Sequence, residues 1–143
     1  MGPAEVILLV DDDANDILTA QTSFAKANSS NPLHVVSSGQ EAIDYLAGAG
    51  QFADRERFPL PTVVLLDLKM PDKDGFEVLE WARAQAMFGG ILFIILTGLE
   101  KISDVNRAYQ AGASSYLIKP FTIDRFNELV ETVQRLRRKR KAA

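Results

Sequence analysis

The stretch Val63–Asp67 reads Val-Val-Leu-Leu-Asp, four branched apolar residues followed by a carboxylate. Similar apolar runs are Val6–Val10 and Ile91–Leu96, and weaker ones are Leu33–Ser37 and Ser115–Ile118. Continuous apolarity, in place of alternation, is typical of strands that are buried on both faces, as in a parallel sheet. The runs therefore predict five strands of a parallel sheet, the third of which ends just before the carboxylate.

Segments with helical periodicity lie between the predicted strands. In each segment, apolar residues share one face: Ile17, Ala20 and Phe24; Ala42, Ile43 and Leu46; Phe76, Leu79 and Met87; Val105, Ala108 and Tyr109; Ile123, Phe126, Val130 and Val133. Strict alternation of strands and helices predicts an open, doubly wound α/β sheet with right-handed crossovers. Residues 48–61 would form a connection of 14 residues, much longer than the about two to six that are typical of such folds.

Local signals indicate where some helices begin and end. Residues 38–41, Ser-Gly-Gln-Glu, have the spacing of a capping box at the start of the second helix. Gly48 and Gly112 stand where C-terminal glycines end helices. Asp13 is expected to cap the first helix, and Gly75 to serve a turn that needs a positive φ angle.

Composition restricts the function further. The 143 residues fit one domain, and the absence of cysteine excludes disulfides, thiolate metal sites and thiol nucleophiles. No signal peptide or membrane-spanning run is visible, so we expect a cytoplasmic protein that does not bind membranes. Residues 135–143 carry six basic side chains, and the remaining chain holds 10 bases against 19 acids, a balance that does not favour nucleic acid. We expect a core of about residues 5–136 and a basic tail at 137–143, which forms a solvated last turn where cations complement the helix dipole.

Polar side chains follow four of the predicted strands. In chain order they are Asp11, Asp12 and Asp13 after the first strand, Asp67 after the third, Thr97 after the fourth, and Lys119-Pro120 after the fifth. In an open α/β sheet, ligands bind beyond the carboxyl ends of the strands. The sequence thus predicts that carboxylates, a hydroxyl and an ammonium converge at one edge of the sheet.

The chemistry of this edge can be derived from its residue types. Packed carboxylates repel one another and favour a bound cation, and oxygen ligands without His or Cys suit Mg²⁺ or Mn²⁺. A carboxylate is ionised at neutral pH and can attack phosphorus to form an aspartyl phosphate. Lys119 and the metal would then neutralise the phosphoryl oxygens, and the Thr97 hydroxyl would donate a hydrogen bond to one of them.

Four motifs in this order resemble the response-regulator receiver family. They are Asp11-Asp12, Asp67-Leu-Lys-Met-Pro-Asp-Lys-Asp-Gly75, Thr97-Gly98 and Tyr116-Leu-Ile-Lys119-Pro120-Phe121, and the match runs from about Val6 to about Leu136. The resemblance implies a flavodoxin-like sheet with strand order 2-1-3-4-5, flanked by five helices, and a cis Lys119–Pro120 bond. It also implies that Asp67 accepts a phosphoryl group from the phosphohistidine of a sensor histidine kinase.

The resemblance implies roles for the surrounding residues as well. Asp12, Asp67 and the backbone carbonyl of Lys69 would hold Mg²⁺ (or Mn²⁺), with Asp11 acting mostly through water. Thr97 and Tyr116 would form the switch pair, in which the hydroxyl moves toward the phosphoryl group and the ring turns inward. Lys69 and Leu99, each two residues beyond a site residue, would set the lifetime of the phosphoryl group.

Three functions compete for this site. The first is a response regulator without an effector domain, which is not an enzyme and signals by conformational change and protein contact. The second is a phosphatase of the haloacid-dehalogenase type, but its Asp-x-Asp motif would need a carboxylate where Lys69 stands. The third is a degenerate receiver that acts as a constitutive interaction module, which the presence of Asp12, Asp67, Thr97 and Lys119 disfavours.

The sequence also suggests partners. The chain ends just after the fifth helix, so we expect output through docking, dimerisation or phosphoryl relay. The long connection at 48–61 is similar to that of the small regulators that serve phytochrome-like histidine kinases. A homodimer is expected through the fourth helix, fifth strand and fifth helix, because Leu129 and Leu136 lie off the apolar line of the fifth helix, where they extend the core or contact a partner.

Overall fold

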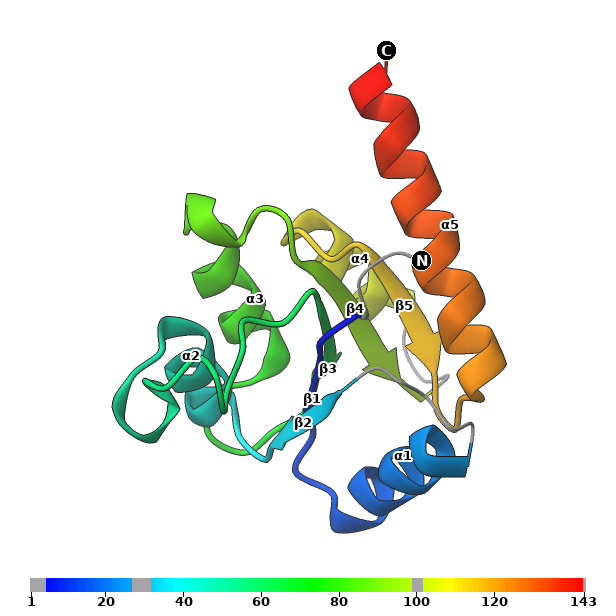
Figure 1. Ribbon diagram of the computed structural model, residues 1–143. Helices are drawn as coiled ribbons and strands as arrows, with labels where there is room; N and C mark the ends of the chain where they lie inside the picture. The colour runs from blue at the N-terminus through cyan, green and yellow to red at the C-terminus, as the bar shows by residue number, and fades with distance from the viewer. Residues whose placement is uncertain (1–4, 27–31, 99–101, 143) are drawn as a thin grey trace.

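Five parallel strands form one sheet at the centre of the computed structural model, which describes residues 5–26, 32–98 and 102–142 (Figure 1). The strands are β1 (Ile7–Val10), β2 (Leu33–Val36), β3 (Val63–Asp67), β4 (Leu92–Thr97) and β5 (Ser115–Ile118). Their spatial order is β2-β1-β3-β4-β5, and every neighbouring pair is parallel. The predicted strand order is confirmed, and the strand ends agree with the predicted ones to within one residue.

Helices cover both faces of this sheet (Figure 1). The helices α2 (Gly39–Ala47), α3 (Gly75–Arg83) and α4 (Ile102–Gln110) pack on one face, and α1 (Ala14–Lys26) and α5 (Ile123–Ala142) on the other. Successive strand residues point to opposite faces, so Leu8 and Leu66 join the core beneath α2 and α3. Leu9 and Leu65 join the second core, beneath α1 and α5. This double burial explains why the strands are apolar throughout.

The structure confirms the predicted ends of α2 and α4, except that the Glu41 side chain binds a different donor from the one expected in a capping box. The Ser38 hydroxyl accepts a hydrogen bond from the Glu41 N–H (3.1 Å), as a capping box requires. The Glu41 carboxylate, however, accepts from the N–H (3.0 Å) and hydroxyl (2.9 Å) of Ser37, one residue before the expected donor. Gly48 and Gly112 follow α2 and α4 with φ angles of 67° and 110°, a region that favours glycine.

The long connection at 48–61 is folded against the end of α2. It contains a short 3₁₀ helix, η1 (Gly50–Phe52). The Arg55 guanidinium donates to the carbonyls of Tyr45 (2.8 Å) and Leu46 (2.7 Å), which belong to the last turn of the helix. Phe52 and Phe58 pack on the Tyr45 ring at centroid distances of 5.1 and 6.0 Å. The extra length is therefore used as a cap on α2.

The last helix includes the basic residues near the end of the chain. α5 continues to Ala142, so residues 137–142, predicted as a basic tail that forms a solvated last turn, belong to the helix, which extends past the sheet (Figure 1). Leu129 packs partly buried against the core beneath α1 and α5, whereas Leu136 is 54% exposed. Leu136 is therefore the more accessible of the two leucines to a partner. Within the three described ranges, no helix combines the length and apolarity that a membrane span requires.

Candidate functional site

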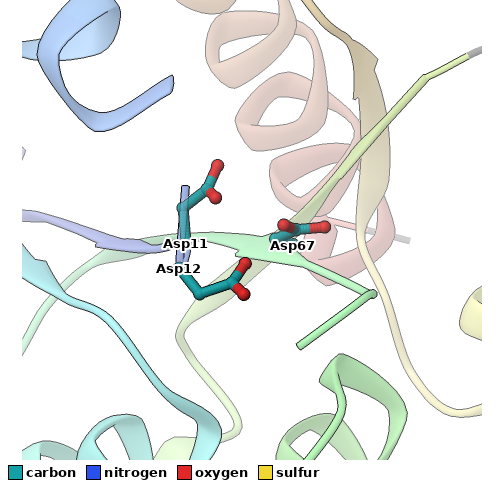
Figure 2. A group of neighbouring side chains, drawn as sticks. All are labelled: Asp11, Asp12 and Asp67. Carbon is teal, nitrogen blue, oxygen red and sulfur yellow. The ribbon is translucent and has the colours of Figure 1, made fainter. Parts of the chain in front are cut away.

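The carboxyl ends of β1 and β3 bring three carboxylates together. Asp11 and Asp12 follow β1 directly, and Asp67 is the last residue of β3. One carboxylate oxygen from each lies within 4.8 Å of the others, and Figure 2 shows the three side chains at the ends of the two strands. Asp11 is 1% exposed, Asp12 is exposed and Asp67 lies between these extremes. The cluster thus reaches from the protein interior to solvent.

The register of the sheet and two local hydrogen bonds produce this arrangement. Val10 pairs with Leu66, so the next residues along both strands leave the sheet side by side. Asp11 Oδ1 accepts from the N–H of Asp13 at 3.0 Å, and Asp67 Oδ1 accepts from the N–H of Lys69 at 3.1 Å. Each aspartate therefore has one oxygen held by the backbone, and the second oxygen of each lies beside Lys119.

Lys119, which follows β5, supplies the positive charge at the site. Its Nζ lies 3.1 Å from Asp11 Oδ2, 3.4 Å from Asp67 Oδ2 and 2.9 Å from Asp16 Oδ2. The Lys119–Pro120 peptide bond is cis, as expected. Asp16 was not among the predicted site residues. It lies in the first turn of α1, where an acid is expected from the helix dipole alone.

Burial and charge oppose each other in this cluster. Burial raises the pKa of Asp11 to about 6, although the Asp13 N–H and the Lys119 ammonium lower it in part. Burial also lowers the pKa of Lys119, but the hydrogen bond to Asp16 and the charges of Asp67 and Asp11 raise it more strongly, to above its usual value. Lys119 is therefore protonated at neutral pH, whereas the ionised form of Asp11 is costly.

The chemistry of the donor set fits a divalent cation. Among the described residues, Asp11 Oδ2 is buried without a hydrogen-bond partner, and the Lys119 ammonium 3.1 Å away forms an ion pair with it. A buried carboxylate oxygen left in this way favours a positive ligand. Asp11, Asp12 and Asp67 offer three oxygens and no nitrogen or sulfur, which suits Mg²⁺ or Mn²⁺.

Thr97 and Tyr116 occupy neighbouring strands. Thr97 is the last residue of β4 and lines, together with Asp67 and Lys69, a small cavity of about 30 Å³. Tyr116 on β5 is 41% exposed, and its ring contacts that of Tyr109 on α4 edge to face, with centroids 6.4 Å apart. The hydroxyl is thus beside the expected phosphoryl position and the tyrosine ring points outward. Leu99 lies outside the described residues.

Gly75 is present for a reason other than the predicted one. It opens α3, and its φ is not among the positive angles of the described glycines, which are those of Gly48, Gly50 and Gly112. A Cβ atom at Gly75 would stand 2.6 Å from the carbonyl oxygen of Asp67. The position therefore requires glycine because the helix start lies directly against the backbone of the candidate phosphoacceptor.

The sequence also did not predict a contact between the loop after Asp67 and the start of α2. The Asp72 carboxylate accepts hydrogen bonds from the N–H groups of Gly39 (3.2 Å) and Gln40 (3.1 Å) at the start of α2. A Cβ atom at Gly39 would lie 2.0 Å from the carbonyl oxygen of Lys73. The loop at 68–74 is therefore docked on the N-terminus of α2, where a negative charge is favourable.

Comparison with known proteins agrees with this geometry. Residues 7–133 match the sequence profile of the response regulator receiver domain. The response regulator Rcp1 of Synechocystis sp. is 29% identical over 93% of this chain and 88% of its own length. Its solved Mn²⁺-bound form is 30% identical to this chain, with a TM-score of 0.72 over 91% of this chain and 89% of that one.

Two solved structures of phytochrome response regulators are also similar. The bacteriophytochrome response regulator AtBRR is 31% identical, with a TM-score of 0.80 over 93% of this chain and 94% of that one. The phosphorylated cyanobacterial phytochrome response regulator RcpA is 27% identical, with a TM-score of 0.75 over 94% of this chain and 91% of that one.

The raised pKa of Asp11 predicts a stability effect in metal-free buffer. The folded-state pKa is about 6 and the ordinary value 3.8, so folding favours the neutral acid. The cost of the charge is thus absent below about pH 4, grows as the pH rises to about 6 and is complete above it. Asp11→Asn should raise the free energy of unfolding by up to about 3 kcal/mol at pH 7, with no gain below pH 4. Thermal and urea unfolding across this pH range measure the difference.

Added Mg²⁺ should offset this difference in the free energy of unfolding between the wild type and Asp11→Asn. The wild type gains about 2.7 kcal/mol when the free metal is 100-fold above its dissociation constant, and Asp11→Asn should lose most of that gain. Asp12→Asn is the matched control, because it removes an exposed carboxylate from the same cluster. It should leave metal-free stability nearly unchanged and also lose the gain from Mg²⁺. A metal-free Asp11→Asn that is less stable than the wild type at pH 7 would contradict the prediction.

Proposed function

The chain belongs to the response regulator receiver domain family, and we propose that it accepts a phosphoryl group on Asp67 from a sensor histidine kinase in a Mg²⁺-dependent reaction. Members of this family are signalling proteins. The observation that carries the proposal is the cluster of three carboxylates with the Lys119 ammonium beside two of them. The Mn²⁺-bound form of Rcp1 supports a divalent cation in a related protein.

The proposed transfer needs no general base on this chain. Because carboxylates are ordinarily ionised at neutral pH, no proton has to be removed, and one oxygen of Asp67 attacks the phosphorus atom of the donor phosphohistidine. The new O–P bond forms as the N–P bond breaks, and the electron pair stays on the imidazole nitrogen. A cation held by Asp12, Asp67 and the backbone carbonyl of Lys69, with Asp11 acting through water, would neutralise phosphoryl charge. The Lys119 ammonium adds a second positive charge, and the Thr97 hydroxyl offers a hydrogen bond.

The alternatives are less well supported. A haloacid-dehalogenase-type phosphatase would need a general acid two residues after Asp67, where the exposed Lys69 lies. A degenerate receiver would lack part of the phosphoryl machinery, whereas Asp12, Asp67, Thr97 and Lys119 are all present.

The kinase partner is proposed from the relatives. AtBRR and RcpA are phytochrome response regulators, and both cover more than nine-tenths of this chain. We therefore propose a phytochrome-type histidine kinase as the phosphodonor. Phosphotransfer profiling against the histidine kinases of the source organism tests this, and preferential transfer from a kinase without a phytochrome sensor would refute it.

The first consequence of this function is that labelling depends on Asp67. Acetyl phosphate with Mg²⁺ should add one phosphoryl group to the wild type, as measured by intact-protein mass spectrometry, and Asp67→Asn should reduce this to background. Asp54→Asn is the control, because it removes an exposed aspartate in the 48–61 connection. Wild-type labelling of Asp67→Asn would refute the assignment, since the variant has lost the nucleophilic carboxylate.

The lifetime of the phosphoryl group is proposed to depend on Lys69 and Leu99. Lys69 lines the cavity that also contains Asp67 and Thr97, and an ammonium cannot act as a base toward the attacking water. Lys69→Asn, whose amide can orient water, should speed dephosphorylation by at least about threefold and change phosphorylation little. Lys73→Asn on the same loop is the control. Equal changes in both rates would indicate a general disturbance of the site.

The output surface is proposed to be α4, β5 and α5, and to support a homodimer. Thr97 ends β4 beside Asp67, and Tyr116 on β5 contacts Tyr109 on α4, so movement at the phosphoryl group would reach this face first. A shallow cavity of about 190 Å³ between β5 and α5 is lined by Tyr116, Leu117, Arg125, Glu128, Leu129 and Thr132. Leu136, further along α5, adds an exposed apolar side chain.

A variant at Leu136 tests the dimer. Beryllofluoride, a mimic of the phosphoryl group on Asp67, should shift the wild type toward a dimer, by the about 1–3 kcal/mol that is typical of such coupling. Leu136→Glu places a charge on the proposed contact and should remain monomeric under the same conditions. Light scattering at high protein concentration measures both. A wild type that is monomeric with and without beryllofluoride would exclude the dimer and leave the phosphoacceptor assignment intact.

A further inference from the structure

Asp16 is the acidic residue nearest to the Lys119 ammonium, yet it does not belong to the carboxylate cluster. Lys119 Nζ donates a hydrogen bond to Asp16 Oδ2 at 2.9 Å, compared with 3.4 Å to Asp67 Oδ2. The two partners are 103 positions apart in the chain and meet because α1 packs beside the end of β5. The Asp16 side chain is 41% exposed, and Lys119 is 22% exposed.

We propose that Asp16 is a positioning residue that holds the Lys119 ammonium toward α1 while Asp67 is unmodified, and that it competes with a phosphoryl group on Asp67 for this ammonium. The inference rests on the proposed function and adds to it a residue that sets the balance between the two states.

The geometry allows the ammonium to change partners. A lysine has a flexible four-carbon stem and three donor hydrogens, so a small rotation transfers it from one acceptor to another. A cavity of about 180 Å³, lined in part by Asp16, Thr19, Lys119 and Phe121, leaves room on the α1 side. Asp16 is half exposed and can be resolvated when its partner leaves, whereas Asp11 is buried and cannot.

Charge decides the direction of the exchange. A phosphoryl group carries about −1.5 to −2 charges at neutral pH, so it attracts the ammonium more strongly than the single charge of Asp16. Before phosphorylation, Asp16 draws the ammonium away from Asp67 and leaves the Asp67 carboxylate more available to a cation. Asp16 should therefore strengthen Mg²⁺ binding to the unmodified site and weaken the binding of a phosphoryl group.

The experiment measures both affinities in Asp16→Asn. Binding of Mg²⁺ alone, followed by calorimetry, should weaken by about fivefold, the size that a partly screened ion pair supports. Binding of beryllofluoride at saturating Mg²⁺ should tighten by a similar factor, about fivefold. A merely structural defect would weaken both. Asp124→Asn is the control, because it removes an exposed carboxylate from the first turn of another helix, α5. It should change neither affinity by more than about twofold.

A double-mutant cycle separates the role of Lys119 from simple charge removal. In the Lys119→Gln background, Asp16→Asn should leave the Mg²⁺ affinity within about twofold of that of Lys119→Gln alone, because the ammonium that transmits the effect is missing. An equal effect of Asp16→Asn with and without Lys119 would overturn the proposal, as would unchanged affinities in the wild-type background. A wild type that binds neither Mg²⁺ nor beryllofluoride would instead refute the proposed function itself.

Discussion

The repulsion among carboxylates at the edge of the sheet, and its balance by one ammonium, is the constraint on which the rest of this structure depends. Because β1 and β3 pair in parallel with Val10 opposite Leu66, Asp11 and Asp67 lie side by side. Lys119 reaches both from the end of β5, so three separate strands must be in place before the charges are balanced. The two apolar cores beneath the helices hold these strands in position. Burial of apolar surface therefore supports a polar site that would not assemble by itself.

The same balance connects the fold to the proposed signalling chemistry. A site that satisfied all its charges internally would have no reason to bind a cation or a phosphoryl group. Within the described part of the chain, Asp11 Oδ2 has no hydrogen-bond partner, and the Lys119 ammonium is divided among Asp11, Asp16 and Asp67. The unmodified protein is thus electrostatically incomplete at one edge, and the proposed ligands are of the kind that would complete it.

Much of this could be predicted from the sequence, because each strand is marked by its apolar run and a candidate site residue ends or follows four of the five strands. Asp67 and Thr97 end their strands, so the topology rule for open sheets was sufficient to place them at the same edge. Asp16 could not be found in this way, because its role depends on how α1 packs against a segment 103 positions away.

Gly75 was assigned to a turn because sequence shows that glycine is needed without showing whether conformation or space requires it. Whether Leu129 and Leu136 complete the core or face solvent depended on how α5 lies on the sheet.

The docking of the loop at 68–74 on α2 makes the two sides of the phosphoacceptor mechanically unequal. Asp72 is bound to the first N–H groups of α2, and Gly39 and Gly75 leave no space for even one additional carbon atom at either end of the loop. Well-packed backbone contacts of this kind resist compression. On the side of Asp67 that faces α2, the backbone is therefore held in place by close packing. A disturbance at Asp67 therefore meets a tightly packed support toward α2, so α2 is poorly placed to move in response.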